Sequence, residues 1–169
     1  MKFVLSLLLL TLSCVSASAE TPRIDRIEIV DYGVYSAHID RQAAAPGTMA
    51  GEMNLLNNVE HAVTTRMITA QLGVHFGFRY TVVGGPEGTA VSLHHVTIIP
   101  NPGLNNPANH RRKTRNEYDL TSLIGEQSYT DYSFDNDWEI VPGIWTFQIW
   151  YGDRMLAEQK FTIVRRRGG

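Results

Sequence analysis

The sequence predicts an all-β fold: a single immunoglobulin-like antiparallel β-sandwich of about seven strands that follows an N-terminal signal peptide. Short segments of alternating apolar and polar residues recur along the chain, and clusters of turn-forming residues separate them. The chain shows almost no helical periodicity, and the part after the signal peptide has the length of one domain. Such a series of short strands is typical of an antiparallel sandwich.

The last part of the sequence reads as a β-hairpin with a tight turn. Its first strand alternates apolar and polar residues, Gly152 and Asp153 form a two-residue turn, and residues 154–164 return. The inward residues expected in the two strands are Trp145, Phe147, Ile149, Tyr151, Phe161 and Ile163. Leu156 has the opposite parity, so we expect a bulge near Ala157. Because an isolated hairpin is only marginally stable, this one must pack on further strands.

Earlier segments supply the other strands. The strongest alternation runs from Leu72 to Val83, and a glycine-rich turn follows at residues 84–88. The next strand, Thr89–Ile99, changes parity at His94 and His95, which predicts either a bulge or a fully buried strand end. The remaining extended segments are expected at Ile24–Tyr35, His61–Gln71 and Ser128–Phe134, with one helical turn at Asp119–Ile124.

Two long segments lack a clear period and are predicted as loops, the first of them mobile. They are Ile39–Val59, which contains an Ala-Pro-Gly stretch, and Asn101–Glu117, which contains two prolines and a basic cluster. Since long loops carry function more often than packed strands do, these two segments are the expected contact surface.

The N-terminus predicts export. Residues 1–19 combine a positive start at Lys2, an apolar run too short for a typical membrane span, and the small residues Ala17–Ala19 before a cleavage site at Glu20. The mature domain is then expected at residues 20–164, with a frayed basic tail at residues 165–169. This predicts a periplasmic or secreted protein without a transmembrane span.

The single cysteine, Cys14, lies inside the predicted signal peptide. Lipid attachment there is the alternative to simple cleavage, but the residues before it, Thr11–Ser13, match a lipoprotein signal poorly. Removal of Cys14 leaves a domain that must be stable without a disulfide. The formal net charge of −2 argues against a nucleic-acid partner.

Several short motifs in order resemble a bacterial family of exported domains of unknown function, family 3859. They are Gly73–Tyr80, the turn Gly84–Gly88, Val96–Gly103 and Pro142–Trp145. The similarity spans about Ile24 to Val164, nearly the whole mature chain. The resemblance implies a small β-sandwich and brings no catalytic residues. The chain lacks the cysteine pair of true immunoglobulin domains.

Two features are candidate binding residues. A basic cluster in the second long segment could dock an anionic partner, and it consists of Arg111, Arg112, Lys113 and Arg115. The alternative interpretation is that these residues lie in a solvated surface loop and bind no partner. Trp150 has the opposite parity to Trp145; we expect it to be covered and part of the core, and a partner contact is the alternative if its face is exposed.

We predict no metal or cofactor site from the sequence. His94 and His95 are adjacent on a strand, so they point to opposite faces and cannot easily share a metal with each other. Residues 135–139 place oxygen ligands at alternate positions, but the pattern lacks the glycine and helices of a calcium loop, and we interpret it as an acidic turn. No nucleophile elbow, zinc-protease motif or phosphate loop is present.

The leading hypothesis is therefore an exported, non-catalytic accessory module that binds an envelope protein or an anionic polymer. One alternative is a small secreted hydrolase with carboxylate or histidine chemistry, which a concave pocket containing Asp135, Asp137 or His95 would favour. Another is a structural or chaperone-like module that pairs an exposed sheet edge with a second chain.

Overall fold

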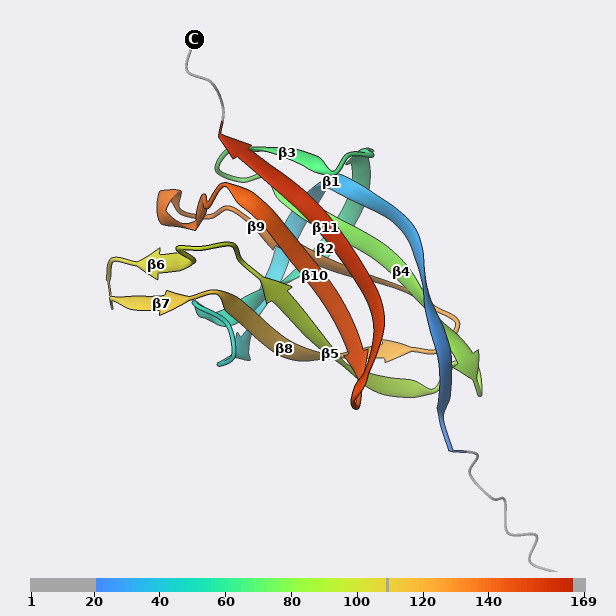
Figure 1. Cartoon of the computed structure of the whole chain (residues 1–169). Coiled ribbons are helices and arrows are strands. Elements are labelled where there is room, and N and C mark those ends of the chain that lie inside the picture. The colour runs from blue at the N-terminus through green and yellow to red at the C-terminus, as the bar shows by residue number, and fades with distance from the viewer. Residues whose placement is uncertain (1–20, 109, 166–169) are drawn as a thin grey trace, which may run out of the picture.

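The computed structural model describes residues 21–108 and 110–165, and these residues form β-strands joined by turns and one short 3-10 turn (Figure 1). The first strands are β1 (Arg23–Ala45), β2 (Gly51–Val63), β3 (Met67–Ala70), β4 (His75–Gly85) and β5 (Ala90–Ile98). They are followed by β6 (Leu104–Asn106), β7 (Arg111–Lys113), β8 (Arg115–Leu123), β9 (Gln127–Ser133), the 3-10 turn η1 (Asp137–Glu139), β10 (Gly143–Tyr151) and β11 (Arg154–Arg165).

The strands form two main sheets that pack face to face. One sheet has the order β2-β1-β4-β9 and the other the order β3-β11-β10-β5-β8, while β6 and β7 form a small separate ribbon. Neighbouring strands are antiparallel except the β11–β3 pair. The predicted all-β sandwich is therefore confirmed, with more strands than about seven, because segments predicted as loops also pair.

The core lies between the two sheets, where strictly alternating residues of β4 and β10 meet. Phe76, Phe78, Tyr80 and Val82 of β4 are fully buried, and so is Trp145 of β10. The Phe76 ring contacts five other aromatic rings, those of Tyr132, Phe134, Trp145, Phe147 and Phe161. Burial of each such side chain contributes about 1.5–3 kcal/mol, so this cluster supplies much of the stability of the described domain.

The C-terminal hairpin has the predicted register. Trp145 pairs with Phe161, and the register shifts by one residue at the turn end, where Ile149 pairs with Ala157 and Trp150 with Met155. The shift leaves Leu156 unpaired and packed against the core, which confirms the predicted bulge beside Ala157.

The prediction of a mobile loop at Ile39–Val59 is wrong. β1 continues to Ala45 and β2 returns from Gly51, so this segment is an extended two-stranded arm. We call residues 39–59 the arm. Its side chains are mostly polar or exposed on both faces, so backbone pairing holds it without a hydrophobic period.

The second predicted loop and the predicted helical turn also differ from the structure. Leu104–Asn106 and Arg111–Lys113 form the β6–β7 ribbon, and β8 already begins at Arg115. Residues 119–123 belong to β8, not to a helical turn. Two inward positions of β8 carry Asn116 and Ser122, both buried, and such polar inward residues hide the alternation that marks a strand.

Three further predictions concern residues at or near the ends of strands, and the structure decides each of them. β5 pairs continuously through His94 and His95, so the parity change reflects a buried strand end and no bulge. Leu72 precedes β4 and is exposed, so it does not share the core face. Arg165 pairs with Ala70 at the end of β11, so it is not part of a frayed tail. The signal peptide, Cys14 and residues 166–169 lie outside the described residues.

Candidate functional site

The arm folds back onto the sandwich and meets the start of β8. The Gly47 carbonyl oxygen accepts hydrogen bonds from the Glu117 backbone N–H, at 3.1 Å, and from Lys113 Nζ, at 2.7 Å. The Met49 backbone N–H donates to Asn116 Oδ1 at 2.9 Å. A Cβ atom on Gly47 would lie 2.1 Å from the Glu117 carbonyl oxygen, so only glycine allows this approach. The two long segments that the sequence analysis predicted as loops are therefore in direct contact through hydrogen bonds.

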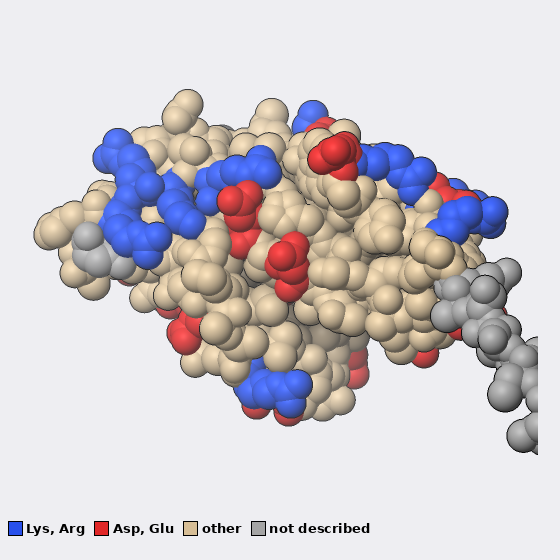
Figure 2. All heavy atoms as spheres, turned by 90° about the horizontal axis from the view of Figure 1, so that it is seen from below, with Lys and Arg blue, Asp and Glu red and all other residues tan. Residues whose placement is uncertain are grey.

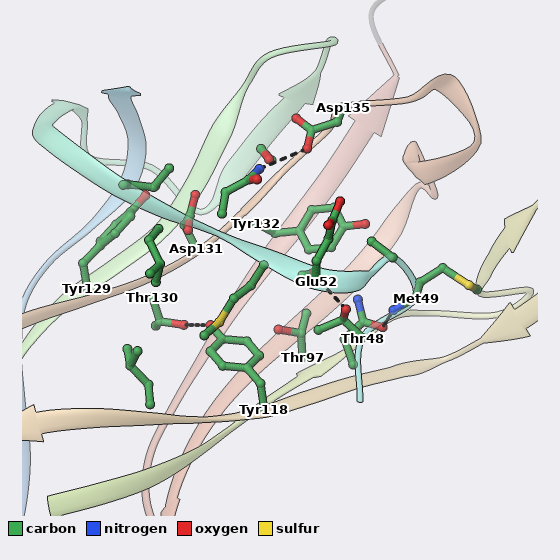
Figure 3. Close-up of a pocket in the computed structure, with 18 of the residues that line it drawn as sticks. Thr48, Met49, Glu52, Thr97, Tyr118, Tyr129, Thr130, Asp131, Tyr132 and Asp135 are labelled. Atoms are coloured by element: carbon green, nitrogen blue, oxygen red, sulfur yellow. Dashed lines mark hydrogen bonds between the residues drawn. The ribbon is translucent and has the colours of Figure 1, made fainter. Parts of the chain in front are cut away.

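Beneath the arm lies a cavity of about 330 Å³, between the arm and the edge strands β8 and β9 (Figure 3). Its apolar lining comes from Met49, Ala50, Met53, Leu55, Leu56, Val59 and Leu120. Its aromatic lining is Tyr118, Tyr129 and Tyr132, and its acidic lining is Glu52, Asp131, Asp135 and Glu139. A mostly apolar cavity with a few polar groups and this volume is the usual form of a small-ligand site.

A buried polar network supports the Tyr118 side of the cavity. The Tyr118 ring stacks on the imidazole of His95 with centroids 5.2 Å apart, and its hydroxyl lies 3.3 Å from Thr130 Oγ1. His95 contacts Thr130 Oγ1 through Nδ1 at 3.2 Å and the Tyr80 hydroxyl through Nε2 at 3.2 Å. Burial, with the nearby His94, lowers the His95 pKa to about 4, so His95 is neutral at pH 7.

Two of the acidic residues have strong partners inside the protein. Asp131 accepts a hydrogen bond from His75 at 2.9 Å, and this bond raises the His75 pKa, whereas burial raises the pKa of Asp131. The buried Glu139 carboxylate accepts the backbone N–H groups of Asp135 and Asn136 at 2.7 and 2.9 Å. Burial raises the Glu139 pKa, although those two bonds oppose the shift.

Two further polar groups in the lining are less satisfied. Among the described residues, the Asp135 carboxylate accepts a side-chain hydrogen bond from Asn54 on the arm alone, and this bond is long, at 3.4 Å. Within the described residues the Tyr129 hydroxyl is buried without a hydrogen bond of good geometry. Burial and the neighbouring Asp131 carboxylate raise the pKa of the Tyr129 hydroxyl, and this group faces Asp131 without a well-formed hydrogen bond, which is costly.

The predicted basic cluster is divided by the fold. Arg111 and Arg112 are exposed on β7, where Figure 2 shows basic side chains gathered at the end of the molecule that carries the β6–β7 ribbon. Lys113 instead anchors the arm, and Arg115 pairs with Glu117 at 2.8 Å. Lys113 and Arg115 therefore have intramolecular roles, and a binding role for the cluster stays a prediction.

Trp150 does not lie in the core. It is half-buried on the outer face of its sheet, because it has the opposite parity to Trp145 and Phe147, and its indole N–H donates to the Gln148 side chain at 3.1 Å. The expectation of a core residue is wrong, and a contact role stays a prediction.

His94, His95 and the acidic turn at residues 135–139 make contacts within the protein. His94 lies on the outer face with Asp119, at 2.9 Å, and Glu117, at 3.6 Å, while His95 points inward. In the acidic turn, Glu139 caps η1. Within residues 21–108 and 110–165, no three His, Cys, Asp or Glu side chains are placed to hold a metal ion, and no helix is long and apolar enough to cross a membrane.

Comparisons with known proteins agree with this architecture. The chain is similar to an immunoglobulin-like protein from Pseudomonas aeruginosa, PA1606, with 25% sequence identity and a TM-score of 0.56. The match covers 88% of this chain and 100% of that one, so the fold is that of an immunoglobulin-like sandwich. Residues 24–163 match the domain of unknown function DUF3859, and the chain belongs to this family, as its motifs predicted. The comparison with curated proteins gave no match.

No pattern in the sequence indicated the cavity. Its acidic and aromatic residues come from the arm, β8, β9, Asp135 and η1, and the arm is far from the others along the chain. The one local signal is the run Tyr129–Tyr132 in β9, where large polar side chains point to both faces of an edge strand.

Proposed function

We propose that this protein is an exported, non-catalytic binding module of the bacterial envelope, and that it holds part of a protein or polymer partner in the cavity beneath the arm. The observation that carries the proposal is the cavity itself, which is roofed by a segment tied down through Gly47 and Asn116. A hairpin roof over a preformed, mostly apolar site suits a module that encloses one group of its partner.

Asp135 lies in the cavity lining, as the hydrolase alternative required, but the arrangement of the histidines supports a binding role over a hydrolytic one. A general base needs an accessible, basic group beside the nucleophile, with a third group to orient it. The His95–Thr130 pair lacks this arrangement, because His95 is buried with a lowered pKa and its second nitrogen faces the Tyr80 hydroxyl. His75 is paired with Asp131 rather than with a hydroxyl or a thiol.

Crosslinking in the envelope fraction tests the proposal. Tagged protein is expressed with its N-terminal segment, crosslinked, and compared with the variants Leu55→Trp, which fills the cavity, and Ile39→Trp, which adds the same bulk to an exposed arm position outside the lining. We expect one consistent partner with wild type and Ile39→Trp, and none with Leu55→Trp. Equal capture by all three would refute the cavity as the binding site, and turnover in a substrate screen would refute a non-catalytic role.

A second candidate surface is the β6–β7 ribbon, as a dock for an anionic polymer. Arg111 and Arg112 are adjacent and exposed there. Binding through them should weaken as salt rises and should be lost in the charge-reversal variant Arg111→Glu/Arg112→Glu. If neither added salt nor the charge-reversal variant weakens polymer binding, the ribbon is not the binding surface.

A further inference from the structure

The cavity beneath the arm has a one-sided charge. Among the described residues that line it, every ionisable side chain other than tyrosine is acidic: Glu52, Asp131, Asp135 and Glu139. Two basic groups lie beside the lining without belonging to it: His75 contacts Asp131, and Lys113 Nζ donates to the carbonyl oxygen of Gly47, next to Thr48. Even a fully charged His75 would offset only one of the four carboxylates.

The carboxylates differ in what they can offer to a bound molecule. Asp131 and Glu139 are engaged, the first by His75 and the second by two backbone N–H groups. Glu52 and Asp135 are exposed and lie at the mouth of the site, where Figure 3 shows Glu52 between Tyr132 and Thr48. These two are the carboxylates best placed to meet a ligand.

The walls suit the apolar part of the same ligand. Met53, Leu55 and Leu56 of the arm are half-buried over the cavity, and tyrosine rings from β8 and β9 complete it. Aromatic faces attract ammonium and guanidinium groups, and apolar side chains cover the methylene stems that carry such groups.

We propose that the group held in this cavity is an organic cation on an apolar stem, an ammonium or guanidinium group such as a lysine or arginine side chain or a small amine carries. The inference rests on the proposed function and names the chemistry of the enclosed group. An anion would enter a site bounded by four carboxylates. A neutral apolar group would remove water from Glu52 and Asp135 without a compensating partner, which is costly. Burial and the negative charges of Glu139 and Asp135 also raise the Tyr132 pKa, as expected where added negative charge is disfavoured.

Three compounds that differ only in their polar end test the charge preference: 4-phenylbutylamine, 4-phenylbutanol and 4-phenylbutyrate. Binding to the mature protein is followed by NMR chemical-shift titration at pH 7 and low salt, because salt screens exposed carboxylates. We expect shifts at the arm and β9, with the amine binding at least about tenfold more tightly than the alcohol and the carboxylate not binding. Equal or tighter binding of the alcohol or the carboxylate, or no cavity shift with the amine, overturns the inference.

A carboxylate-removal variant with a matched control locates the effect. Glu52→Gln/Asp135→Asn should lower amine affinity about tenfold and leave alcohol affinity unchanged, because it changes charge at nearly constant shape. Glu60→Gln removes an exposed carboxylate from the same strand outside the lining and should change neither affinity. An amine affinity that falls equally in both variants overturns the inference, because it would reflect net charge and not this cavity.

A peptide pair distinguishes the two sources of the cation. Leu-Lys-Leu, acetylated and amidated, is compared with its norleucine counterpart, which has a similar stem and no charge. Preference for the lysine peptide over 4-phenylbutylamine supports a polypeptide source, and preference for the amine supports a small molecule. Preference for norleucine overturns the inference. The crosslinking of Leu55→Trp tests the proposed function separately, since it depends on cavity volume and not on charge.

Discussion

Protonation of His95 should destabilise the fold by a predictable amount. Burial lowers its pKa from 6.5 to about 4, so below pH 6.5 the unfolded chain binds a proton that the folded protein does not. The stability linked to His95 is therefore present above pH 6.5 and is lost as the pH falls through the interval between the two values. The loss is about 2 kcal/mol at pH 5 and about 3 kcal/mol at pH 4.

Urea unfolding at pH 7 and pH 5 measures this loss. Wild type should lose about 2 kcal/mol more than His95→Gln over this interval, because other groups titrate in both proteins. The variant also loses contacts to Thr130 and Tyr80, so it should be less stable than wild type at pH 7. If the variant does not fold, NMR titration of the wild-type imidazole gives the same information. A difference between the two proteins that does not change with pH, or a His95 ring that titrates near pH 6.5, would refute the reasoning.

Three further predictions follow from single contacts. Gly47→Val should lift the arm, because its Cβ would collide with the Glu117 carbonyl, and the Glu117 amide should exchange its hydrogen about tenfold faster; unchanged protection would show that the arm tolerates the side chain. Phe76→Ala should lower the free energy of unfolding by about 3–5 kcal/mol in urea, and a loss under about 1 kcal/mol would contradict the aromatic packing. His75→Asn should remove a contribution that is present below pH 6.5 and lost as the pH rises through the raised pKa of His75, so wild type should lose its advantage over the variant as the pH rises above 6.5; a constant advantage would argue against a charged His75–Asp131 pair.

The sequence predicted those parts of the fold in which one side of a strand is buried and the other is not. Phe76, Phe78 and Tyr80 alternate with small or polar residues, so their common face is visible without a structure. The bulge at Leu156 was predictable for the same reason, since a single residue of the wrong parity needs an extra residue to reach the core.

The arm could not be predicted in this way. Ile39 is exposed, and the half-buried residues Leu55 and Leu56 are adjacent in sequence, so the buried side of the arm carries no two-residue period. Its strands form because backbone groups pair with each other, and such pairing leaves no trace in side-chain hydrophobicity. The Ala-Pro-Gly stretch that indicated a loop is the turn at the arm's tip, residues 45–50.

The cavity was hidden for a different reason, and that reason bears on its role. The core is filled by fully buried aromatic rings, whereas Leu55 and Leu56 of the arm remain half-buried beside an open volume of about 330 Å³. Folding alone would favour filling that space, because buried apolar area stabilises by about 25 cal/mol per Å². A site that must admit a ligand has to leave this space unfilled in the free protein. Functional sites are where proteins give up stability that tighter packing would supply. Leu55→Trp should therefore raise the melting temperature of the free protein while abolishing capture of the partner. A variant that loses both stability and capture would indicate that the arm is packed for stability, and that the cavity is a consequence of imperfect packing rather than a binding site.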